Sequence, residues 1–332
     1  MRQLKYISPS SLGTWEKDRE DFYYRQLADV RPDRPPQENY MSIGSAFDAY
    51  VKAELYSACF GPGFNPQFEF DALFTEQVEE HNRDWAFVAG KYAFDSYCIT
   101  GSYDELLAAL QRSAVPPQFE FRVDGNVHGV PLMGKPDCRY ITPAGVHVIL
   151  DWKVNGFCSV HGATPYKYYR MIRDGWEGKA SRGASRPHKK YVPVEFGDMA
   201  IGSHGLEETC QDWADQLSIY GWMLGEKVGG MDAVMCIDQL ACKYQEGKFP
   251  LIRVANHCCR ISPEWQERLV TRLTSCWNAI QAGLIYDDLT AEENAERIEM
   301  LEMTAVNKAG AVTEMDEWLL SLSGSSMKFR KR

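Results

Sequence analysis

Two aspartates and a lysine lie close together in the middle of the sequence, at a spacing that allows metal-assisted hydrolysis. Asp137 follows Pro136, and the run of Asp151, Trp152 and Lys153 comes after 13 intervening residues. Side chains alternate along a strand, so Asp151 and Lys153 are expected to project from the same face. Two carboxylates offer hard oxygen ligands to Mg²⁺ or Mn²⁺, which polarises a phosphoryl oxygen and acidifies a bound water. With a lysine to orient that water or to stabilise developing negative charge, the set is suited in outline to phosphodiester hydrolysis.

The apolar surroundings of Asp151 and Lys153 make these charges conspicuous. Residues 146–154 form a β-branched run that reads as a central strand, and the two charged residues interrupt it. A buried charge needs a metal ion or an ion pair. The turn signal at residues 142–145 predicts a hairpin that brings Asp137 close to Asp151. The alternative is a surface hairpin whose Asp and Lys side chains are solvated or weakly paired.

The strands that must position these residues are predicted from period-two patterns and turn signals. A turn is expected at Asp124-Gly125-Asn126, and short turns between sequential strands indicate an antiparallel meander. The expected strands are residues 119–123, 127–141 with a bulge near Gly134, 146–154, 232–243 and 249–261.

Helical periodicity alternates with these strands and predicts an α/β fold with a mixed central sheet flanked by helices. Ser8 and Pro9 read as the cap and first residue of the opening helix. A linker is expected at residues 31–36, a loop at 60–70 and a long irregular insertion at 156–205. The expected helices are residues 8–27, one that follows Gly44, 71–89, 103–112, 207–225, 263–283 and 290–308.

Composition sets the class of protein. The 332 residues are 45% hydrophobic and 25% charged, which fits a globular chain of about two domains and excludes disordered, collagenous and coiled-coil classes. No run approaches ~18 apolar residues, so no membrane span or membrane partner is expected. The start lacks an apolar signal region, and the ten cysteines are scattered without a C-x-x-C pair. We therefore expect reduced thiols and a cytoplasmic location.

Charge is unevenly distributed along the chain. The net charge of -10, taken alone, argues against a nucleic-acid partner. However, residues 287–317 hold ten acidic and two basic side chains, whereas residues 166–191 hold eight basic and two acidic ones, interleaved with aromatic residues. Such a basic, aromatic segment can neutralise phosphates and stack on bases, although a merely solvated loop is the alternative. Its basic residues are Lys167, Arg170, Arg173, Lys179, Arg182, Arg186, Lys189 and Lys190.

Taken in order, these motifs resemble the PD-(D/E)XK nucleases, and among them the RecB-type exonuclease branch often encoded by bacteriophages. Asp137, Asp151 and Lys153 match the signature itself. The resemblance covers about residues 6–285. The further matching segments are Ser8–Leu12 to the opening helix, Gly44–Asp48 to a Gly-x-x-x-His motif, Phe119-Glu120 to an acidic strand, and Gln216–Tyr220 to a Gln-Leu-x-x-Tyr helix.

The resemblance implies a restriction-endonuclease-like core and a role for each matching residue. Asp137 and Asp151 would be ligands of Mg²⁺ or Mn²⁺, with the Trp152 carbonyl as a third, and Lys153 would be the catalytic lysine. Gln216 and Tyr220 share a helix face and would contact the DNA backbone or support the lysine. Ordinary packing of an amphipathic helix is the alternative for that pair.

Two departures from the family pattern concern its metals. Asp48 stands where the branch has a histidine ligand. It would either bind the metal or pair with Lys52 on an exposed helix face, and Glu54 is an off-register alternative. Glu120 would be a second-metal carboxylate or part of a strand-edge salt bridge. Some relatives hold an iron–sulfur cluster through one early and three late cysteines, but the first helix has no cysteine, so no cluster is expected.

The expected function is Mg²⁺-dependent DNA exonuclease activity in phage recombination or DNA processing. The expected partners are DNA, a phage single-strand annealing protein and further copies of the chain, in the host cytoplasm if the gene is carried by a phage. Residues 1–286 would form the nuclease domain, and 287–332 an acidic helix and a short basic tail. The acidic helix would face away from DNA or contact a basic partner. The alternatives are an endonuclease of restriction or CRISPR-adaptation type and a non-catalytic DNA-binding protein.

Overall fold

A computed structural model describes the chain except for residues 171, 175–190, 231 and 326–332, and describes only the backbone at 172–174 and 311–325. The chain divides into two compact units. Unit 1 comprises Met1–Pro35, Asn126–Leu132 and Val270–Arg332; unit 2 comprises Pro36–Gly125 and Met133–Leu269. The predicted nuclease domain over residues 1–286 and its acidic appendage over 287–332 stay predictions.

Unit 2 contains a six-stranded mixed sheet, as the alternation of strand and helix patterns predicted. β5 is an inner strand that pairs antiparallel with β4 and parallel with β9. The sheet order is β1 (Gln118–Phe119), β4 (Cys138–Ile141), β5 (His147–Asn155), β9 (Ala233–Lys243), β10 (Leu251–Cys259) and β6 (Ile172–Asp174).

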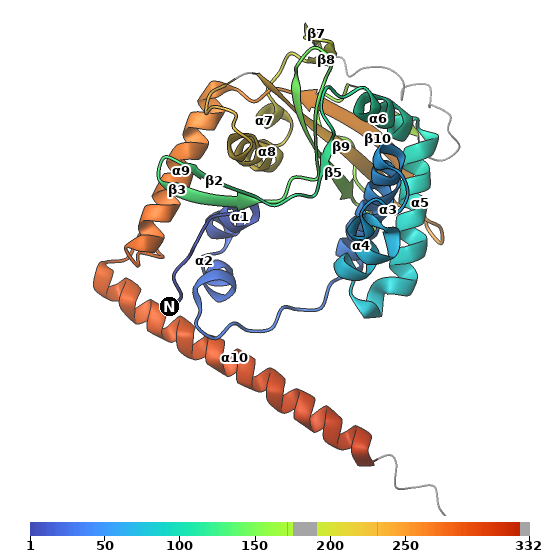
Figure 1. Ribbon diagram of the computed structural model, residues 1–332. Coiled ribbons are helices and arrows are strands. Elements are labelled where there is room, and N and C mark those ends of the chain that lie inside the picture. Colours follow the sequence, from blue (N-terminus) through green and yellow to red (C-terminus); the bar gives the residue numbers. More distant parts are fainter. Residues whose placement is uncertain (171, 175–190, 231, 326–332) are drawn as a thin grey trace, which may run out of the picture. The chain divides into compact units, whose positions relative to one another are not determined.

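Helices cover both faces of this sheet (Figure 1). On one side are α3 (Asn39–Phe60), α5 (Arg83–Ile99) and α6 (Ser102–Gln111), with α4 (Phe70–Gln77) packed on α3; on the other are α7 (Leu206–Thr209) and α8 (Gln211–Met223). Val148, Leu150 and Trp152 pack in the core shared with α3 and α5, whereas Ile149 packs in the core shared with α8. The period-two alternation of β5 therefore directs Asp151 and Lys153 to the α8 side.

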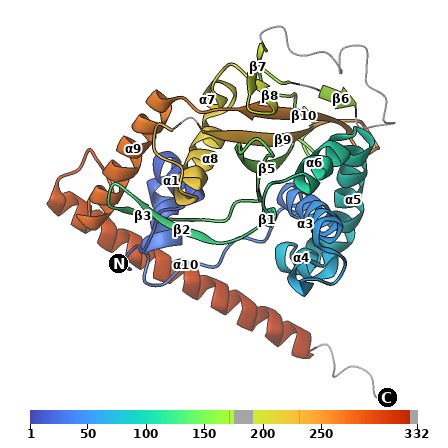
Figure 2. The ribbon, with the colours of Figure 1, turned by 45° about the horizontal axis from the view of Figure 1, so that its top comes forward.

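Unit 1 holds the two ends of the chain. Its elements are α1 (Pro9–Lys17), α2 (Arg19–Phe22), a π-helix (Tyr23–Leu27), the end of α9 (Pro263–Gln281) and the long helix α10 (Ala291–Ser325), which is clear in Figure 2. Ser8 caps α1 and Pro9 is its first residue, as predicted. The Tyr23 hydroxyl donates to Glu302 at 2.8 Å and joins the π-helix to α10.

The predicted antiparallel pairing is correct for β4 and β5, but the strands expected at residues 119–123 and 127–141 differ from the structure. The turn at Thr142–Gly145 is confirmed by a 2.8 Å hydrogen bond from the Gly145 amide to the Thr142 carbonyl. The expected strand 119–123 breaks at Glu120, whose φ is +44°. The expected strand 127–141 is two strands, β3 (Val130–Gly134) and β4.

The turn predicted at residues 124–126 also lies elsewhere. Those residues belong to β2 (Val123–Val127), which forms a two-stranded sheet with β3. The turn is formed by His128 and Gly129, both with positive φ, and the Asn126 side chain accepts a hydrogen bond from the Gly129 amide at 2.9 Å. The asparagine thus stabilises the turn from the preceding strand, which the Asp-Gly-Asn signal did not distinguish.

Several helix boundaries differ from the predictions for local reasons. The opening helix divides at Asp18, whose side chain caps α2, and the helix expected from 207 divides at Cys210. α3 begins at Asn39, before Gly44, and α10 continues to Ser325. The insertion contains β6 and the hairpin β7 (Pro193–Phe196) and β8 (Met199–Gly202), so its expected lack of regular structure is wrong there. In the described part of the chain, no helix has the length and apolar character needed to cross a bilayer.

Candidate active site

Asp137 and Asp151 meet because two antiparallel strands carry them. Cys138 pairs with Leu150, so Asp137, which immediately precedes β4, lies beside Asp151 on β5. Asp137 Oδ2 accepts a hydrogen bond from the amide of Trp152, the residue after Asp151, at 3.2 Å. The hairpin therefore brings the two aspartates together, as its spacing predicted.

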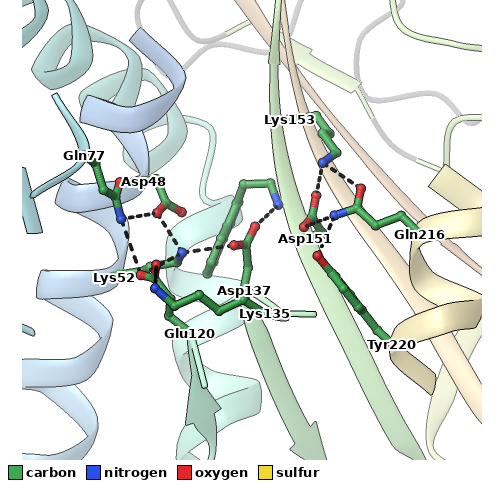
Figure 3. Close-up of polar contacts among 11 residues, drawn as sticks. Asp48, Lys52, Gln77, Glu120, Lys135, Asp137, Asp151, Lys153, Gln216 and Tyr220 are labelled. Atoms are coloured by element: carbon green, nitrogen blue, oxygen red, sulfur yellow. Dashed lines mark hydrogen bonds and ion pairs between the residues drawn. The ribbon is translucent and has the colours of Figure 1, made fainter. Parts of the chain in front are cut away.

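Lys153 and Gln216 complete this side of the site (Figure 3). Lys153 forms an ion pair with Asp151 Oδ2 and donates to Gln216 Oε1 at 3.0 Å. The Gln216 amide nitrogen in turn donates to Asp151 Oδ1 at 3.1 Å and to the Tyr220 hydroxyl at 3.2 Å. Gln216 thus bridges the lysine and the aspartate; whether this helix face also contacts DNA stays a prediction. We call Asp151, Lys153, Gln216 and Tyr220 the strand cluster.

Gly134 makes room for this arrangement. A Cβ at this position would lie 2.6 Å from a ring carbon of Tyr220 and 2.6 Å from the methyl carbon of Met223. Only glycine allows α8 to bring Tyr220 so close to the end of β3. The bulge predicted at Gly134 is thus the point where the expected long strand ends.

A second group of charges adjoins Asp137 and centres on Lys52. The Lys52 ammonium lies 2.6 Å from Asp48 Oδ2, 3.2 Å from Glu120 Oε2 and 2.9 Å from Asp137 Oδ1. Asp48 does pair with Lys52, but the Lys52 side chain is buried and that of Asp48 is half-buried, so the prediction of an exposed pair is wrong. Glu120 also pairs with Lys135, at 2.6 Å, which is the salt bridge weighed for it. We call Asp48, Lys52 and Glu120 the helix cluster; Asp137 contacts both clusters.

Gln77 and Lys135 are residues near the site that the sequence prediction missed, and Lys52 was expected only as an exposed partner of Asp48. Gln77 on α4 donates to Asp48 Oδ2 at 3.1 Å and to Glu120 Oε2 at 3.4 Å. A signal existed for Lys52, because it lies one turn after Asp48 in a largely apolar helix. No comparable signal existed for Gln77. Glu54, the alternative to Asp48, is exposed on α3 and lies near Tyr103.

Burial and neighbouring charges shift the pKa values of the aspartates in opposite directions. Burial and then the Asp137 charge raise the pKa of Asp151 to about 8. Burial also raises the pKa of Asp48 to about 7, against the opposing effect of Lys52. Burial acts in the same sense on Asp137, but the ammonium groups of Lys52 and Lys153 outweigh it and lower that pKa. Asp137 is therefore the aspartate that stays ionised most readily.

The pKa values of Lys52 and Lys153 are both raised, because the neighbouring carboxylates have a larger effect than burial. Burial alone would lower the pKa of Lys52, but the charges of Asp137, Asp48 and Glu120 raise it well above its ordinary value. Burial is likewise outweighed at Lys153, whose pKa is raised by Asp151 and Asp137. Both lysines are therefore positively charged at neutral pH.

The donor set at Asp137 and Asp151 fits Mg²⁺ or Mn²⁺. Two carboxylates and the Trp152 carbonyl are hard oxygen donors, and Mg²⁺ is commonly held by one or two carboxylates with water as the remaining ligands. The register of β4 and β5 places Asp137 beside Asp151, and burial together with the Asp137 charge raises the pKa of Asp151, so a cation between the two carboxyl groups would stabilise them. Within the described residues, no three His, Cys, Asp or Glu side chains form a ready metal cage. A bound ion would therefore depend on backbone and water oxygens as well.

The predicted basic surface is described only in part. Lys167 is exposed, and Arg170 is half-buried and donates to the Ala200 carbonyl at 3.0 Å. The backbone of Arg173 lies in the edge strand β6, opposite Val254. The remaining predicted DNA contacts, Lys179, Arg182, Arg186, Lys189 and Lys190, lie outside the described residues.

Comparisons with known proteins add no identification. No family model matches the chain, and no curated protein matches it. A solved structure titled "Crystal structure of SSO0001" is 9% identical, with a TM-score of 0.25 over 81% of this chain and 85% of that chain. A similarity at this TM-score carries no argument about fold or function.

Proposed function

We propose that this chain is a metal-dependent deoxyribonuclease of the PD-(D/E)XK type, and specifically a RecB-like exonuclease. The observation that carries the proposal is the convergence of Asp137, Asp151 and Lys153 on one side of an inner strand. A charged lysine touching one of two adjoining carboxylates is difficult to explain as a solvated surface pair, because Asp151 is only 4% exposed. The Gln216 bridge further supports a site whose geometry is held by its surroundings.

Each residue has a definable part in phosphodiester hydrolysis. Asp137, Asp151 and the Trp152 carbonyl would hold Mg²⁺, which when bound polarises a phosphoryl oxygen and acidifies a water. Lys153 places a positive charge beside these ligands, where negative charge develops on the phosphate. Gln216 fixes the positions of Lys153 and Asp151 through its two hydrogen bonds.

DNA is the proposed substrate because the basic, aromatic segment 166–191 follows the strand that carries Asp151 and Lys153. The wider biological proposal is phage recombination or DNA processing in the host cytoplasm. There the chain would act beside a single-strand annealing protein, and as a homo-oligomer.

Digestion of linear and closed circular DNA, with Mg²⁺ and with EDTA, tests the proposal. We expect linear DNA alone to be degraded, only with Mg²⁺, and the activity to be lost in Lys153→Ala. Lys91→Ala, which removes an exposed lysine paired with Asp95 on α5, is the matched control and should retain activity. Labels on the 5′ and 3′ ends would give the polarity.

The same experiment separates the alternatives. Nicking or linearisation of the circle would indicate an endonuclease, and salt-sensitive DNA binding without product would indicate a non-catalytic binding protein. Full activity in both Asp151→Ala and Lys153→Ala would overturn the assignment of the site.

A further inference from the structure

Lys52 lies where three carboxylates from three separate segments converge (Figure 3). Asp48 comes from α3, Glu120 follows β1 and Asp137 precedes β4, and each places an oxygen 2.6–3.2 Å from the Lys52 ammonium nitrogen. An ammonium group has three N–H donors, one for each of these oxygens. The Lys52 side chain is only 2% exposed, whereas the three carboxylates are 14–20% exposed, so water hardly reaches the ammonium that they share.

The surroundings hold these carboxylates in place around the ammonium. Gln77 donates to both Asp48 and Glu120, and Lys135 holds the second oxygen of Glu120. The Glu120 backbone has a φ of +44°, in the left-handed region that residues other than glycine rarely adopt. A conformation of this kind persists only where the surrounding structure enforces it.

As they stand around Lys52, the three carboxylates form no ready metal cage, but without the ammonium their oxygens would be suitable ligands for a divalent cation. Aspartate and glutamate oxygens are the ligands of Mg²⁺ and Mn²⁺, and Asp137 belongs to this group and to the proposed metal site alike. A divalent ion placed among Asp48, Glu120 and Asp137 would meet the fixed positive charge of Lys52 at very short range. The repulsion between two cations so close together in a protein interior is large.

We propose that Lys52 is a built-in cation that takes the place of a second metal ion, so that the site holds its divalent ion only between Asp137 and Asp151. The inference rests on the proposed function for that Asp137–Asp151 ion. It adds that Lys52 determines how many ions bind. Lys52 is thus a positioning residue that neutralises and orients Asp137 from the side opposite Lys153.

Counting bound Mn²⁺ tests this inference without any measurement of cleavage. The full chain, free of DNA, is titrated with Mn²⁺, and free ions are measured by electron paramagnetic resonance. We expect one ion per wild-type chain, two per Lys52→Ala chain, and one per Lys52→Arg chain, which keeps the positive charge. Equal numbers in the wild type and in folded Lys52→Ala, or two ions in the wild type, would overturn the proposal.

The two ion counts test the proposed function and the role of Lys52 independently. The wild-type number tests the Asp137–Asp151 ion of the proposed function, whereas the increase by one ion in Lys52→Ala tests the role of Lys52. If the wild type binds no Mn²⁺ and Lys52→Ala binds one ion, the role proposed for Lys52 is retained and the metal-dependent mechanism is rejected.

Folding of the variant is measured in parallel, because removal of Lys52 leaves three carboxyl groups without their shared cation. We expect Mn²⁺ to raise the Tm of Lys52→Ala by more than it raises that of the wild type. Lys52→Gln keeps a hydrogen-bond donor and removes the charge, and should show the same extra ion. If neither neutral variant folds with Mn²⁺ present, a divalent ion cannot replace the ammonium and the proposal is rejected.

Discussion

The strand cluster and the helix cluster both contain a lysine beside acidic residues, but the two lysines differ in exposure and in the number of carboxylates around them. In the strand cluster, the Lys153 side chain is 25% exposed and shares its aspartate with an amide, Gln216. In the helix cluster, the Lys52 side chain is 2% exposed and is enclosed by carboxylates. A lysine that solvent reaches can meet a substrate, whereas an enclosed lysine balances charge. We therefore expect exposure, more than residue type, to separate the chemical role proposed for Lys153 from the charge-balancing role proposed for Lys52.

The largest expected effect is on stability, and it contrasts the two lysines directly. Lys52→Met should lower the free energy of unfolding by about 3–5 kcal/mol, because it removes the buried cation shared by three carboxylates that are only 14–20% exposed. Lys153→Met should lower it by about 1 kcal/mol or less, because this pair is partly exposed and Asp151 can take up a proton. Urea denaturation in EDTA measures both, with Lys91→Met as the exposed control. Equal losses in the two variants would remove the distinction between the clusters.

Gln216 tests whether the strand cluster depends on its bridge. Gln216→Ala removes the hydrogen bonds to Lys153 and Asp151, and we expect the rate of DNA cleavage to fall about 10–100-fold. Gln77→Ala, which removes the analogous amide from the helix cluster, should change the rate less. Steady-state kinetics on linear DNA with Mg²⁺ would measure both variants. A greater loss in Gln77→Ala would reverse the assignment of roles.

The pH dependence of stability should differ once Asp151 cannot titrate. Burial and Asp137 raise its pKa from the ordinary 3.8 to about 8, so in this window the folded chain holds a proton that the unfolded chain releases. The free energy of unfolding therefore falls as pH rises through the window. In Asp151→Asn without metal, we expect this fall between pH about 5 and about 8 to be smaller by about 1–2 kcal/mol. Guanidinium denaturation at several pH values in EDTA measures it, and parallel curves would contradict the assignment.

The smallest expected effect isolates the backbone conformation at Glu120. Glu120→Ala and Glu120→Gly both lose the ion pairs to Lys52 and Lys135, but only glycine adopts a φ of +44° without strain. Glu120→Gly should therefore be more stable than Glu120→Ala by about 1 kcal/mol. Their difference in thermal unfolding gives the value directly. A more stable alanine variant would mean that the left-handed conformation at residue 120 carries no cost.

Local sequence patterns determined the part of the site that the β4–β5 hairpin carries. The β-branched run fixed β5, period-two alternation placed Asp151 and Lys153 on one face, and the turn at 142–145 brought Asp137 beside them. These relations hold over a few residues or one hairpin, and the pattern of apolar residues is enough to specify them. The helical period likewise placed Gln216 and Tyr220 on one face of α8, but their position beside Lys153 and Asp151 depends on contacts across 63 and 65 residues.

Only the tertiary structure decided the helix cluster and the path of the chain around it. Lys52 meets Glu120 and Asp137 across 68 and 85 residues, and Gln77 joins from another helix. The strands within the insertion and the break at Glu120 were equally hidden, because they depend on contacts with distant segments and not on a local repeat. Sequence thus determined which charges share a strand, and packing decided which of them solvent can reach, because burial depends on every element that covers a side chain.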